Sequence, residues 1–582
     1  MVVSTSDGED VSLRNWTHIT LLGIILLVGA VLRVWGIGFG LPAVLARPDE
    51  NVILEVAVNA TSGDLNPKFF TYPTGFIYLL TALFHITVPL FLPPHAINPA
   101  WDFQTLFAIW PEPFYLTGRW VVAIMGIASI SLVYLIGKRV GGRHLGLLAA
   151  WFFAIAPIPV RHAHFSVSDF PMAFFCLLSM IFILRRLQSG GLRDSLLAGI
   201  FGGLAASMKY PGALMALPIL LAHVEWRPFR VQIKHLLWSS VVMIAAFMVL
   251  NPFIFVEWDL FRAHFAYETA HLLAPHEGID LGRGWWYHPS VTFPAALGFP
   301  VYFAAIGGLI WWVIRGGWQR WIIIITPLIF LLVLGRGKAV FFRYLDITFP
   351  LLGILASGFL IEITKLLPWK QSSRLAAVFI LGFLISLPGL VRSVKNDHLL
   401  SQKDTRVQAA EWLHEHLDPG TSVFLSGYFG MPPIVPHFFK YLKITNEREA
   451  NLFEKYQQAV AEAPEWNRYP LSTVQPEDIF PDLSKVAPTA ELWRDSLAAW
   501  DVDWVVMDRY FLPFYSDVPV GLPEALRMDF DLQVTFTCLI PDAKPDPLYE
   551  WQDAFYLPVA RFHGIERPGP ELQIYQRKSV EK

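Results

Sequence analysis

Long apolar runs separated by short polar segments constrain this chain more than any other feature of its sequence. A run of about 20 apolar residues is long enough to cross a bilayer as a helix. Because 54% of the 582 residues are hydrophobic and 16% are charged, the composition is not that of a soluble globular protein. We predict about 11 transmembrane helices, near residues 18–38, 115–137, 145–160, 170–185, 195–208, 210–224, 236–251, 291–314, 320–334, 344–366 and 374–394.

The positions of Lys and Arg orient these helices. Cytoplasmic loops of membrane proteins are enriched in both residues. With the N-terminus inside, every predicted inner loop carries at least two of them. The first apolar run follows an acidic, polar stretch and lacks a small-residue cleavage site, so we interpret it as a signal anchor and first span. We therefore expect a multi-pass protein with its N-terminus in the cytoplasm and its C-terminal segment outside.

One apolar run, Tyr72 to Leu92, conflicts with this orientation. It is long enough to span, but counting it would invert every later loop and break the charge rule. We therefore interpret it as a juxtamembrane or re-entrant helix within a long first outer loop, about 39–114, with a true span as the alternative. A second outer loop, about 252–290, is rich in His, Trp and acidic residues, which favours an amphipathic helix on the membrane surface.

The composition changes after about residue 394, where charged residues become frequent and no membrane-length run recurs. Apolar spacing there predicts helices at Asp404–His416 and Leu492–Trp500. Strand patterns occur at Ser422–Leu425, Trp504–Met507 and Glu571–Gln576. We therefore predict a polytopic α-helical domain over 1–394 and a soluble, extracytoplasmic α/β domain over 395–582. The two cysteines, Cys176 and Cys538, imply no disulfide framework, and the net charge of −3 gives no reason to expect a nucleic-acid partner.

An acidic pair stands where the first helix emerges into the outer loop, in the sequence Arg47-Pro48-Asp49-Glu50. Two adjacent carboxylates at this depth are candidates for acid–base chemistry. The alternative is a solvated acidic start to a juxtamembrane helix, which the helix dipole would favour.

Basic residues also recur on the outer side, where the charge rule predicts few. A single arginine there could simply extend along the lipid headgroups. Together with Asp49, Glu50 and Asp169, however, they suggest a cationic pocket for an anionic substrate, and phosphate is the natural candidate. Asp169 precedes Phe-Pro-Met and would also suit a helix N-cap, and His162 and His164 favour polar lining over a metal site. The basic residues are Arg47, Arg119, Arg161, Lys209, Arg336, Lys338 and Arg343.

These motifs, in this order and on this side, resemble the GT-C superfamily of membrane glycosyltransferases. The likeness is to the protein O-mannosyltransferase and aminoarabinose-transferase-like group, which is similar to the bacterial glycosyltransferase family 39. It covers the membrane part well and the tail loosely. The segments that carry it are Pro48-Asp49-Glu50, Tyr72-Pro73-Thr74, Gly118-Arg119, Asp169 with the Phe-Pro-Met after it, Gly203 to Pro211, and Phe342-Arg343-Tyr344.

The resemblance implies a hexosyl- or pentosyltransferase that inverts the anomeric carbon. It would move a sugar from a polyprenyl-phosphate carrier to a hydroxyl on a glycan, lipid or protein of the cell envelope. It implies Asp49 as catalytic base, Glu50 as its acceptor-side neighbour, and a donor pocket organised by Asp169, His164 and Tyr72. No cofactor is required, although Glu50 could bind a divalent ion in members that use one. The implied donor-phosphate ligands are Lys209, Arg343, Lys338 and Arg119.

Two other classes of function stay open on the sequence. A transporter or lipid flippase fits the number of helices and the buried charges, but it would predict internal repeats and charges near the bilayer midplane. A catalytically inert assembly subunit is disfavoured by the complete acidic and basic set. The tail differs from the luminal domain of the eukaryotic mannosyltransferases, which favours a prokaryotic plasma-membrane enzyme.

Overall fold

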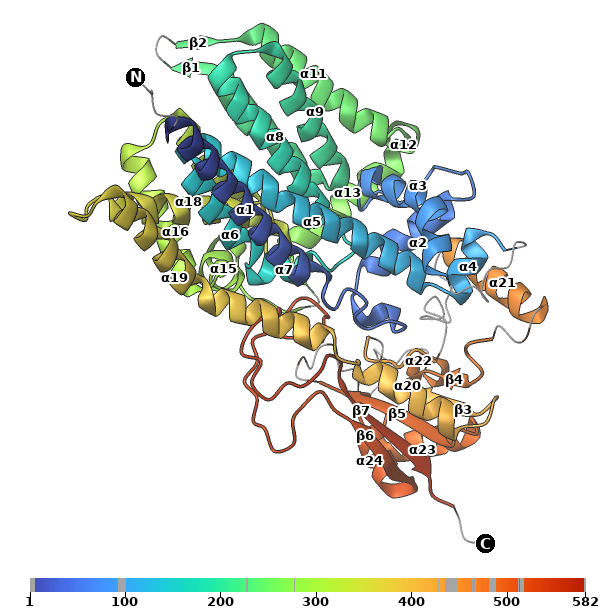
Figure 1. Cartoon of the computed structure of the whole chain (residues 1–582). Coiled ribbons are helices and arrows are strands. Elements are labelled where there is room, and N and C mark those ends of the chain that lie inside the picture. The colour runs from blue at the N-terminus through green and yellow to red at the C-terminus, as the bar shows by residue number, and fades with distance from the viewer. Residues whose placement is uncertain are drawn as a thin grey trace, which may run out of the picture. The chain divides into compact units, whose positions relative to one another are not determined.

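The structure is a computed structural model that describes residues 6–92, 101–226, 229–276, 278–427, 429–434, 447–462, 464, 467–480, 488–510, 512, 515 and 518–579. The chain forms two compact units, each built from separate stretches of sequence (Figure 1). The first comprises Met1–Trp35, Asn66–Leu79 and Gly118–Asp397, and the second Gly36–Leu65, Leu80–Thr117 and His398–Lys582. The predicted domain boundary near residue 394 stays a prediction.

The first unit is helical, apart from the short antiparallel pair β1 (Val224–Trp226) and β2 (Phe229–Val231). Its helices begin with α1 (Ser6–Val34) and end with α19 (Gln371–Leu400), which continues into the second unit. Between them lie α5 (Glu112–Gly141), α6 (Arg143–Ala154), α7 (Pro157–His162), α8 (Asp169–Ser189), α9 (Leu192–Met208), η3 (Tyr210–Met215), α10 (Ala216–Ala222), α11 (Ile233–Leu250), α12 (Phe253–Val256), α13 (Trp258–Leu273), α14 (Gly284–Tyr287), η4 (His288–Thr292), α15 (Phe293–Leu297), α16 (Phe299–Arg315), α17 (Trp318–Leu334), η5 (Phe342–Leu345) and α18 (Thr348–Thr364).

Small residues let the helices of this unit pack backbone against backbone. A Cβ atom at Gly203 of α9 would lie 2.2 Å from the carbonyl oxygen of Met243 in α11. At Gly308 of α16 it would lie 2.0 Å from the carbonyl oxygen of Leu355 in α18. Both contacts are too close for any side chain, as is typical of helix pairs in membranes. Glycine at these two positions therefore sets the spacing of the α9–α11 and α16–α18 pairs.

Several of these helices are long and apolar enough to cross a membrane. Over the described residues, six meet this standard by length and composition, or seven if the bent pair Gly284–Leu297 and Phe299–Arg315 counts as one span. Helices α1 and α11 carry large apolar side chains on their exposed faces, including Leu27 and Val249. Such apolar faces are unfavourable in contact with water but not in contact with lipid. The chain is therefore a multi-pass membrane protein, while the count of about 11 spans stays a prediction.

Helix α3 (Thr74–Phe91) coincides with the apolar run that conflicted with the charge rule. It is one of the six helices that could span by length and composition. Its exposed face carries Ile86 and Leu90. Both a re-entrant helix and a true span would expose such side chains to lipid, so the choice between them stays open.

The N-terminal stretches of the second unit contain η1 (Val44–Ala46), α2 (Glu50–Ala60), α4 (Phe103–Ile109), the start of α5 and the end of α3. Asp102 caps α4, because its Oδ1 accepts a hydrogen bond of 2.8 Å from the Thr105 amide. Helix α2 buries an apolar face that includes Ile53 and Leu54. Much of the predicted first outer loop is thus folded into helices and belongs to the same compact unit as the tail.

The tail of the second unit contains a five-stranded mixed sheet in the order β4-β3-β5-β7-β6. Strand β3 pairs in parallel with β4 and β5, while β7 pairs antiparallel with β5 and β6. The strands are β3 (Ser422–Leu425), β4 (Ser472–Val474), β5 (Trp504–Arg509), β6 (Phe530–Phe536) and β7 (Glu571–Arg577). The tail helices are α20 (Thr405–His416), α21 (Glu447–Glu462), α22 (Pro476–Ile479), α23 (Ala490–Ala499) and α24 (Leu522–Asp529).

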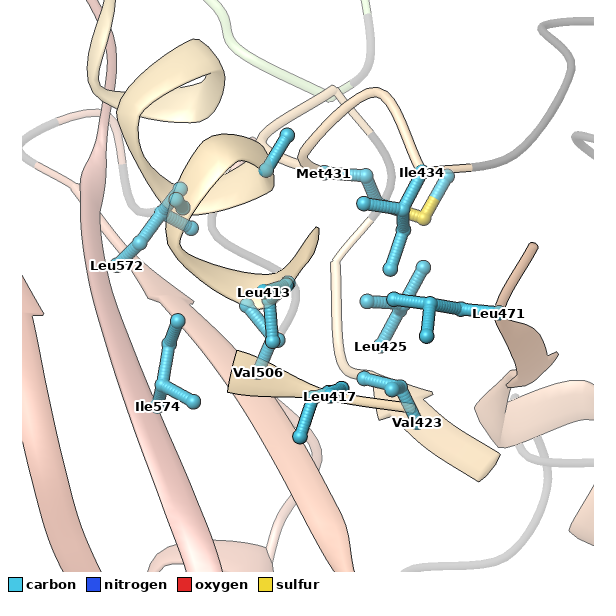
Figure 2. Packing of buried hydrophobic residues seen from close by; sticks show 12 residues of the cluster. Leu413, Leu417, Val423, Leu425, Met431, Ile434, Leu471, Val506, Leu572 and Ile574 are labelled. Atoms are coloured by element: carbon cyan, nitrogen blue, oxygen red, sulfur yellow. The ribbon is translucent and has the colours of Figure 1, made fainter. Parts of the chain in front are cut away.

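Each face of this sheet buries its own apolar cluster, because side chains alternate along a strand. Leu413 of α20 packs with Val423, Leu425, Val506 and Ile574 on one face (Figure 2). The other face buries Phe424, Val505 and Met507 against α23 and α24 through a cluster that includes Trp493, Leu497, Leu522 and Leu526. Helices therefore cover both faces of the sheet.

Candidate functional site

The acidic motif of the first outer loop forms the start of α2. Asp49 is the N-cap residue in the left-handed backbone region, with φ 70° and ψ −22°, and Glu50 is the first helical residue. Asp49 is half-buried, whereas Glu50 is completely buried. The alternative of a solvated acidic helix start is correct about the helix and wrong about Glu50, because packing of α2 covers that carboxylate.

Three residues from separate breaks between helices of the first unit form a charged cluster. Lys209 Nζ donates a hydrogen bond of 2.5 Å to Asp169 Oδ1. Arg343 Nε lies 3.8 Å from Asp169 Oδ2. The Asp169 and Arg343 side chains are 2% and 8% exposed, and that of Lys209 is 12% exposed. Two cations thus share one buried carboxylate, which leaves one positive charge not balanced by Asp169.

Aromatic rings surround the two cations of this cluster. Lys209 Nζ lies 4.8 Å from the ring centroid of Tyr344 and 5.7 Å from that of Tyr72. Arg343 Cζ lies 4.1 Å from the Phe341 ring. Cation–π contacts of this kind stabilise a positive charge without neutralising it. The structure therefore brings together four predicted site residues: Asp169, Lys209, Arg343 and Tyr72.

The local sequence explains why these side chains meet at helix ends. Helix α9 ends at Met208, Lys209 is extended, and Pro211 in the next turn cannot continue an α-helix. Asp169 is the first residue of α8, where the helix dipole favours a negative charge. Ser168 occupies the cap position, so the expectation that Asp169 is an N-cap is wrong by one residue.

A second buried pair lies next to this cluster and was missed by the sequence reasoning. His162 Nδ1 lies 2.7 Å from Asp346 Oδ1, and both side chains are almost fully buried. The Asp346 amide donates a hydrogen bond of 3.2 Å to the Arg343 carbonyl oxygen, which places this pair beside the cluster. The available signal was a single aspartate, three residues after Arg343, at the start of an apolar run.

The arginines predicted to lie on the outer side are buried more deeply than extension along lipid headgroups would allow. Arg47, Arg119, Arg161 and Arg343 are each at most 6% exposed. Arg336 is exposed. Headgroup contact is therefore the wrong explanation for the four buried arginines, which pack inside the protein.

Three other predicted site residues have different surroundings. The ring nitrogens of buried His164 lie 2.9 Å from the Val160 carbonyl oxygen and 3.0 Å from that of Trp35. Arg119 is completely buried. Lys338 Nζ lies 2.6 Å from Asp280 Oδ2 at the surface, and this contact lowers the pKa of Asp280. The roles assigned to these three residues stay predictions.

The two parts of the predicted site belong to different units. Asp49 and Glu50 lie in the second unit, whereas Asp169, Lys209 and Arg343 lie in the first. Asp49 offers a carboxylate that could accept a proton, whereas Lys209 and Arg343 offer cations that could hold an anion. Within the described ranges, no group of three or more His, Cys, Asp or Glu side chains could hold a metal ion.

Comparison with known proteins identifies the class of fold. Residues 95–255 match the family model described as dolichyl-phosphate-mannose-protein mannosyltransferase, a stretch shorter than half of the chain. Among curated proteins, the comparison finds no match to this sequence.

Solved structures align over most of the chain. ArnT from Cupriavidus metallidurans, in the apo state, has a TM-score of 0.52 at 12% identity, covering 97% of this chain and 98% of that one. The same protein bound to undecaprenyl phosphate has a TM-score of 0.50. The oligosaccharyltransferase of Archaeoglobus fulgidus has a TM-score of 0.52 at 13% identity, covering 88% of this chain and 73% of that one. The fold is that of the GT-C glycosyltransferases, which confirms the resemblance predicted from the motifs.

Proposed function

We propose that this chain is an inverting glycosyltransferase that moves a sugar from a polyprenyl-phosphate carrier to an acceptor hydroxyl outside the membrane. The observation that carries the proposal is the buried grouping of Lys209 and Arg343 on Asp169, in a chain with the GT-C fold. ArnT has been solved with undecaprenyl phosphate and AglB from Archaeoglobus fulgidus with a dolichol-phosphate, which supports such a carrier.

The proposed donor site stabilises the leaving group. When the bond between the anomeric carbon and the phosphate oxygen breaks, negative charge develops on the phosphate. Lys209 and Arg343 are fixed by Asp169 and by aromatic rings, so little reorganisation is needed as this charge develops. A lipid phosphate stabilised in this way leaves without a general acid, which distinguishes the reaction from that of glycosidases with two opposed carboxylates.

The proposed base is Asp49. The acceptor oxygen forms its bond to the anomeric carbon from the face opposite the phosphate, so the configuration inverts. The acceptor proton passes to the Asp49 carboxylate, and the electron pair of the broken bond leaves with the polyprenyl phosphate. The half-buried Asp49 carboxylate, at the start of α2, suits this role.

The other predicted residues have supporting roles in the proposal. Lys338 and Arg119 contribute to the positive field for the phosphate, and Glu50 orients the acceptor. A divalent ion near Glu50 is a further option, since the Archaeoglobus fulgidus enzyme was also solved with Zn and sulfate. No proposed step depends on that ion. Asp169, His164 and Tyr72 organise the donor pocket.

The placement of the enzyme follows the sequence prediction. We propose about 11 spans in a prokaryotic plasma membrane, with the N-terminus inside. The five-stranded sheet and its helices would form a soluble extracytoplasmic α/β domain. Acceptors would be protein, lipid or glycan of the cell envelope, and the inhibitory peptide bound to AglB supports a protein among them.

A transporter or flippase of glycolipid precursors is the alternative function. The family model and the solved structures described above are glycosyltransferases, which favours the enzyme. Cations at helix ends rather than in the middle of spans also favour a site at the membrane surface.

A donor panel tests the proposal. The purified full-length chain, in nanodiscs, is incubated with mannosyl, arabinosyl and aminoarabinosyl polyprenyl phosphates, and release of polyprenyl phosphate is measured by mass spectrometry. We expect release from at least one donor, and a loss of turnover of about 10²- to 10⁴-fold in Asp49→Asn. Near-normal transfer by Asp49→Asn would move the base elsewhere. No release from any donor, together with flux of a lipid-linked sugar in proteoliposomes, would establish the transporter.

A further inference from the structure

Arg47, the arginine of the acidic motif, forms a buried ion pair with a residue near the end of the chain. Its Nη1 atom donates a hydrogen bond of 2.6 Å to Oδ1 of Asp553. The two side chains are 1% and 5% exposed, and both residues belong to the second unit. A charge taken out of water is expensive unless it is paired in good geometry. Each side chain therefore depends on the other.

Aromatic contacts reinforce this attachment. Arg47 Cζ lies 5.8 Å from the Phe555 ring centroid. Phe39, earlier in the same loop, packs against Phe555 with ring centroids 5.5 Å apart. The first outer loop thus contacts one short segment of the tail in two ways, through an ion pair with Asp553 and through aromatic packing on Phe555.

The tail segment that receives the loop is irregular but well held. The Asp553 amide donates to the Glu550 carbonyl at 2.9 Å, and the Phe555 amide donates to the Asp553 carbonyl at 2.7 Å. The Leu557 amide donates to the Phe555 carbonyl at 2.8 Å. Asp553, Phe555 and Leu557 are each at most 5% exposed. This segment is therefore buried and internally hydrogen-bonded, although it contains no helix or strand.

The attachment point lies two residues before Asp49. Asp49 has a left-handed backbone, which Asp adopts more readily than most other residues with a side chain. On the far side, Glu50 and Leu54 of α2 are completely buried. Asp49 is thus held between a buried helix and the buried Arg47 side chain.

We propose that Arg47 and Asp553 are positioning residues, through which the tail of the chain holds the carboxylate of Asp49 in place for catalysis. This inference rests on the proposed function, since it presumes that Asp49 is the base. It assigns the tail a direct part in transfer, through the ion pair between two residues 506 positions apart in the sequence.

A second ion pair between the tail and the first outer loop, less deeply buried than the first, provides a control. Arg468 of the tail binds Glu112, with its Nη2 atom 2.7 Å from Oε1, and packs on Trp110 at 4.1 Å. This pair also joins the tail to the predicted first outer loop within the second unit, and Glu112 lies 63 positions after Asp49 in the sequence. Glu112→Gln therefore weakens an attachment of the tail other than the Arg47–Asp553 pair.

The experiment compares Asp553→Asn, Asp553→Glu and Glu112→Gln in the full-length chain, measuring kcat, donor KM and Tm with a donor that the panel identifies. For Asp553→Asn we expect kcat to fall about 10- to 100-fold with donor KM unchanged, because a small displacement of a catalytic group has that effect. Asp553→Glu retains the charge and should recover part of kcat. Glu112→Gln should lower Tm while kcat stays at the wild-type value.

If Asp553→Asn fails to fold, the double variant Arg47→Met/Asp553→Leu replaces the pair by apolar side chains, which buried pairs often tolerate. We expect its Tm to recover and its kcat to stay low. Recovery of both Tm and kcat in the double variant would overturn the inference. So would a normal kcat in folded Asp553→Asn, or a loss of kcat in Glu112→Gln equal to that in Asp553→Asn. Activity of Asp49→Asn distinguishes failure of the proposed base from failure of the proposed positioning role. If Asp49→Asn is active, the proposed base is wrong; if it is inactive while Asp553→Asn is normal, only the positioning role is wrong.

Discussion

The ammonium of Lys209 lies 2.5 Å from a carboxylate oxygen of Asp169, and both side chains are largely buried among apolar helices. A buried pair of this kind is weak evidence for stability, because each ion has lost its hydration. It is better evidence for a binding site, since Arg343 adds a second cation to the same carboxylate.

Lys209→Met should reduce transfer by about 10²- to 10³-fold, because it removes a fixed positive charge from the leaving phosphate. It should also lower stability by about 3–5 kcal/mol, because Asp169 loses its closest partner. The double variant Lys209→Met/Asp169→Asn separates the two effects, with Tm recovering and transfer staying low. Recovery of transfer in the double variant would show that Lys209 serves folding alone. Lys365→Met, which breaks an exposed pair with Glu362, is the control.

Substitutions at Asp49 should differ in stability according to their tolerance of a positive φ. Asn adopts the left-handed region nearly as readily as Asp, whereas a β-branched side chain does not. Asp49→Asn should therefore keep the wild-type Tm, and Asp49→Val should lose about 1–2 kcal/mol. Thermal unfolding followed by tryptophan fluorescence measures both. Equal stability of the two variants would contradict the φ of 70° assigned to Asp49.

Leu413→Ala should destabilise the tail by about 2–5 kcal/mol, because this side chain is fully buried between α20 and the sheet (Figure 2). The control is Glu415→Ala, an exposed position on the same helix. Limited proteolysis of the full-length chain, followed with antibodies to the C-terminus, reports tail unfolding. Equal protease resistance of the two variants would contradict the packing.

The contact between Asp102 and Lys455 should make stability depend on pH. Burial acts to raise the pKa of Asp102, but the Lys455 ammonium and the Thr105 amide outweigh it and lower that pKa below 3.8. A lowered carboxyl pKa stabilises the fold above the unfolded-state value and ceases to do so as pH falls through the folded-state value. The Tm difference between wild type and Asp102→Asn should therefore be present at neutral pH and shrink below about pH 4. A Tm difference that grows as the pH falls would contradict the lowered pKa of Asp102.

Single cysteines on either side of α3 test whether that helix spans the membrane. We expect Ser62→Cys and Ala100→Cys, in a background without Cys176 and Cys538, both to react with an impermeant thiol reagent in intact cells. Ser189→Cys, in a predicted inner loop, should react only after permeabilisation. Labelling of Ser62→Cys alone would mean that α3 crosses the bilayer and that the predicted orientation of every later loop is inverted.

The sequence alone was sufficient for the features that depend on local pattern. Runs of apolar residues of membrane length identified the class of protein, because a helix in lipid must be apolar along its whole length. Spacing of apolar residues located the segments that form α20, β3, β5 and β7, since periods of 3.6 and 2 residues reflect which face of an element is buried. The order of short motifs indicated the GT-C fold.

Only the tertiary structure decided which charges meet. Asp169, Lys209 and Arg343 come from three helix breaks, Asp346 was not singled out, and Asp553 lies in an irregular segment without any pattern. The burial of Glu50 and Arg47 was likewise contrary to the simplest expectation for charged residues in a loop. Periodicity reports the neighbours of a residue within its own helix or strand, whereas a pair such as Arg47 and Asp553, 506 positions apart, depends on how the whole unit packs.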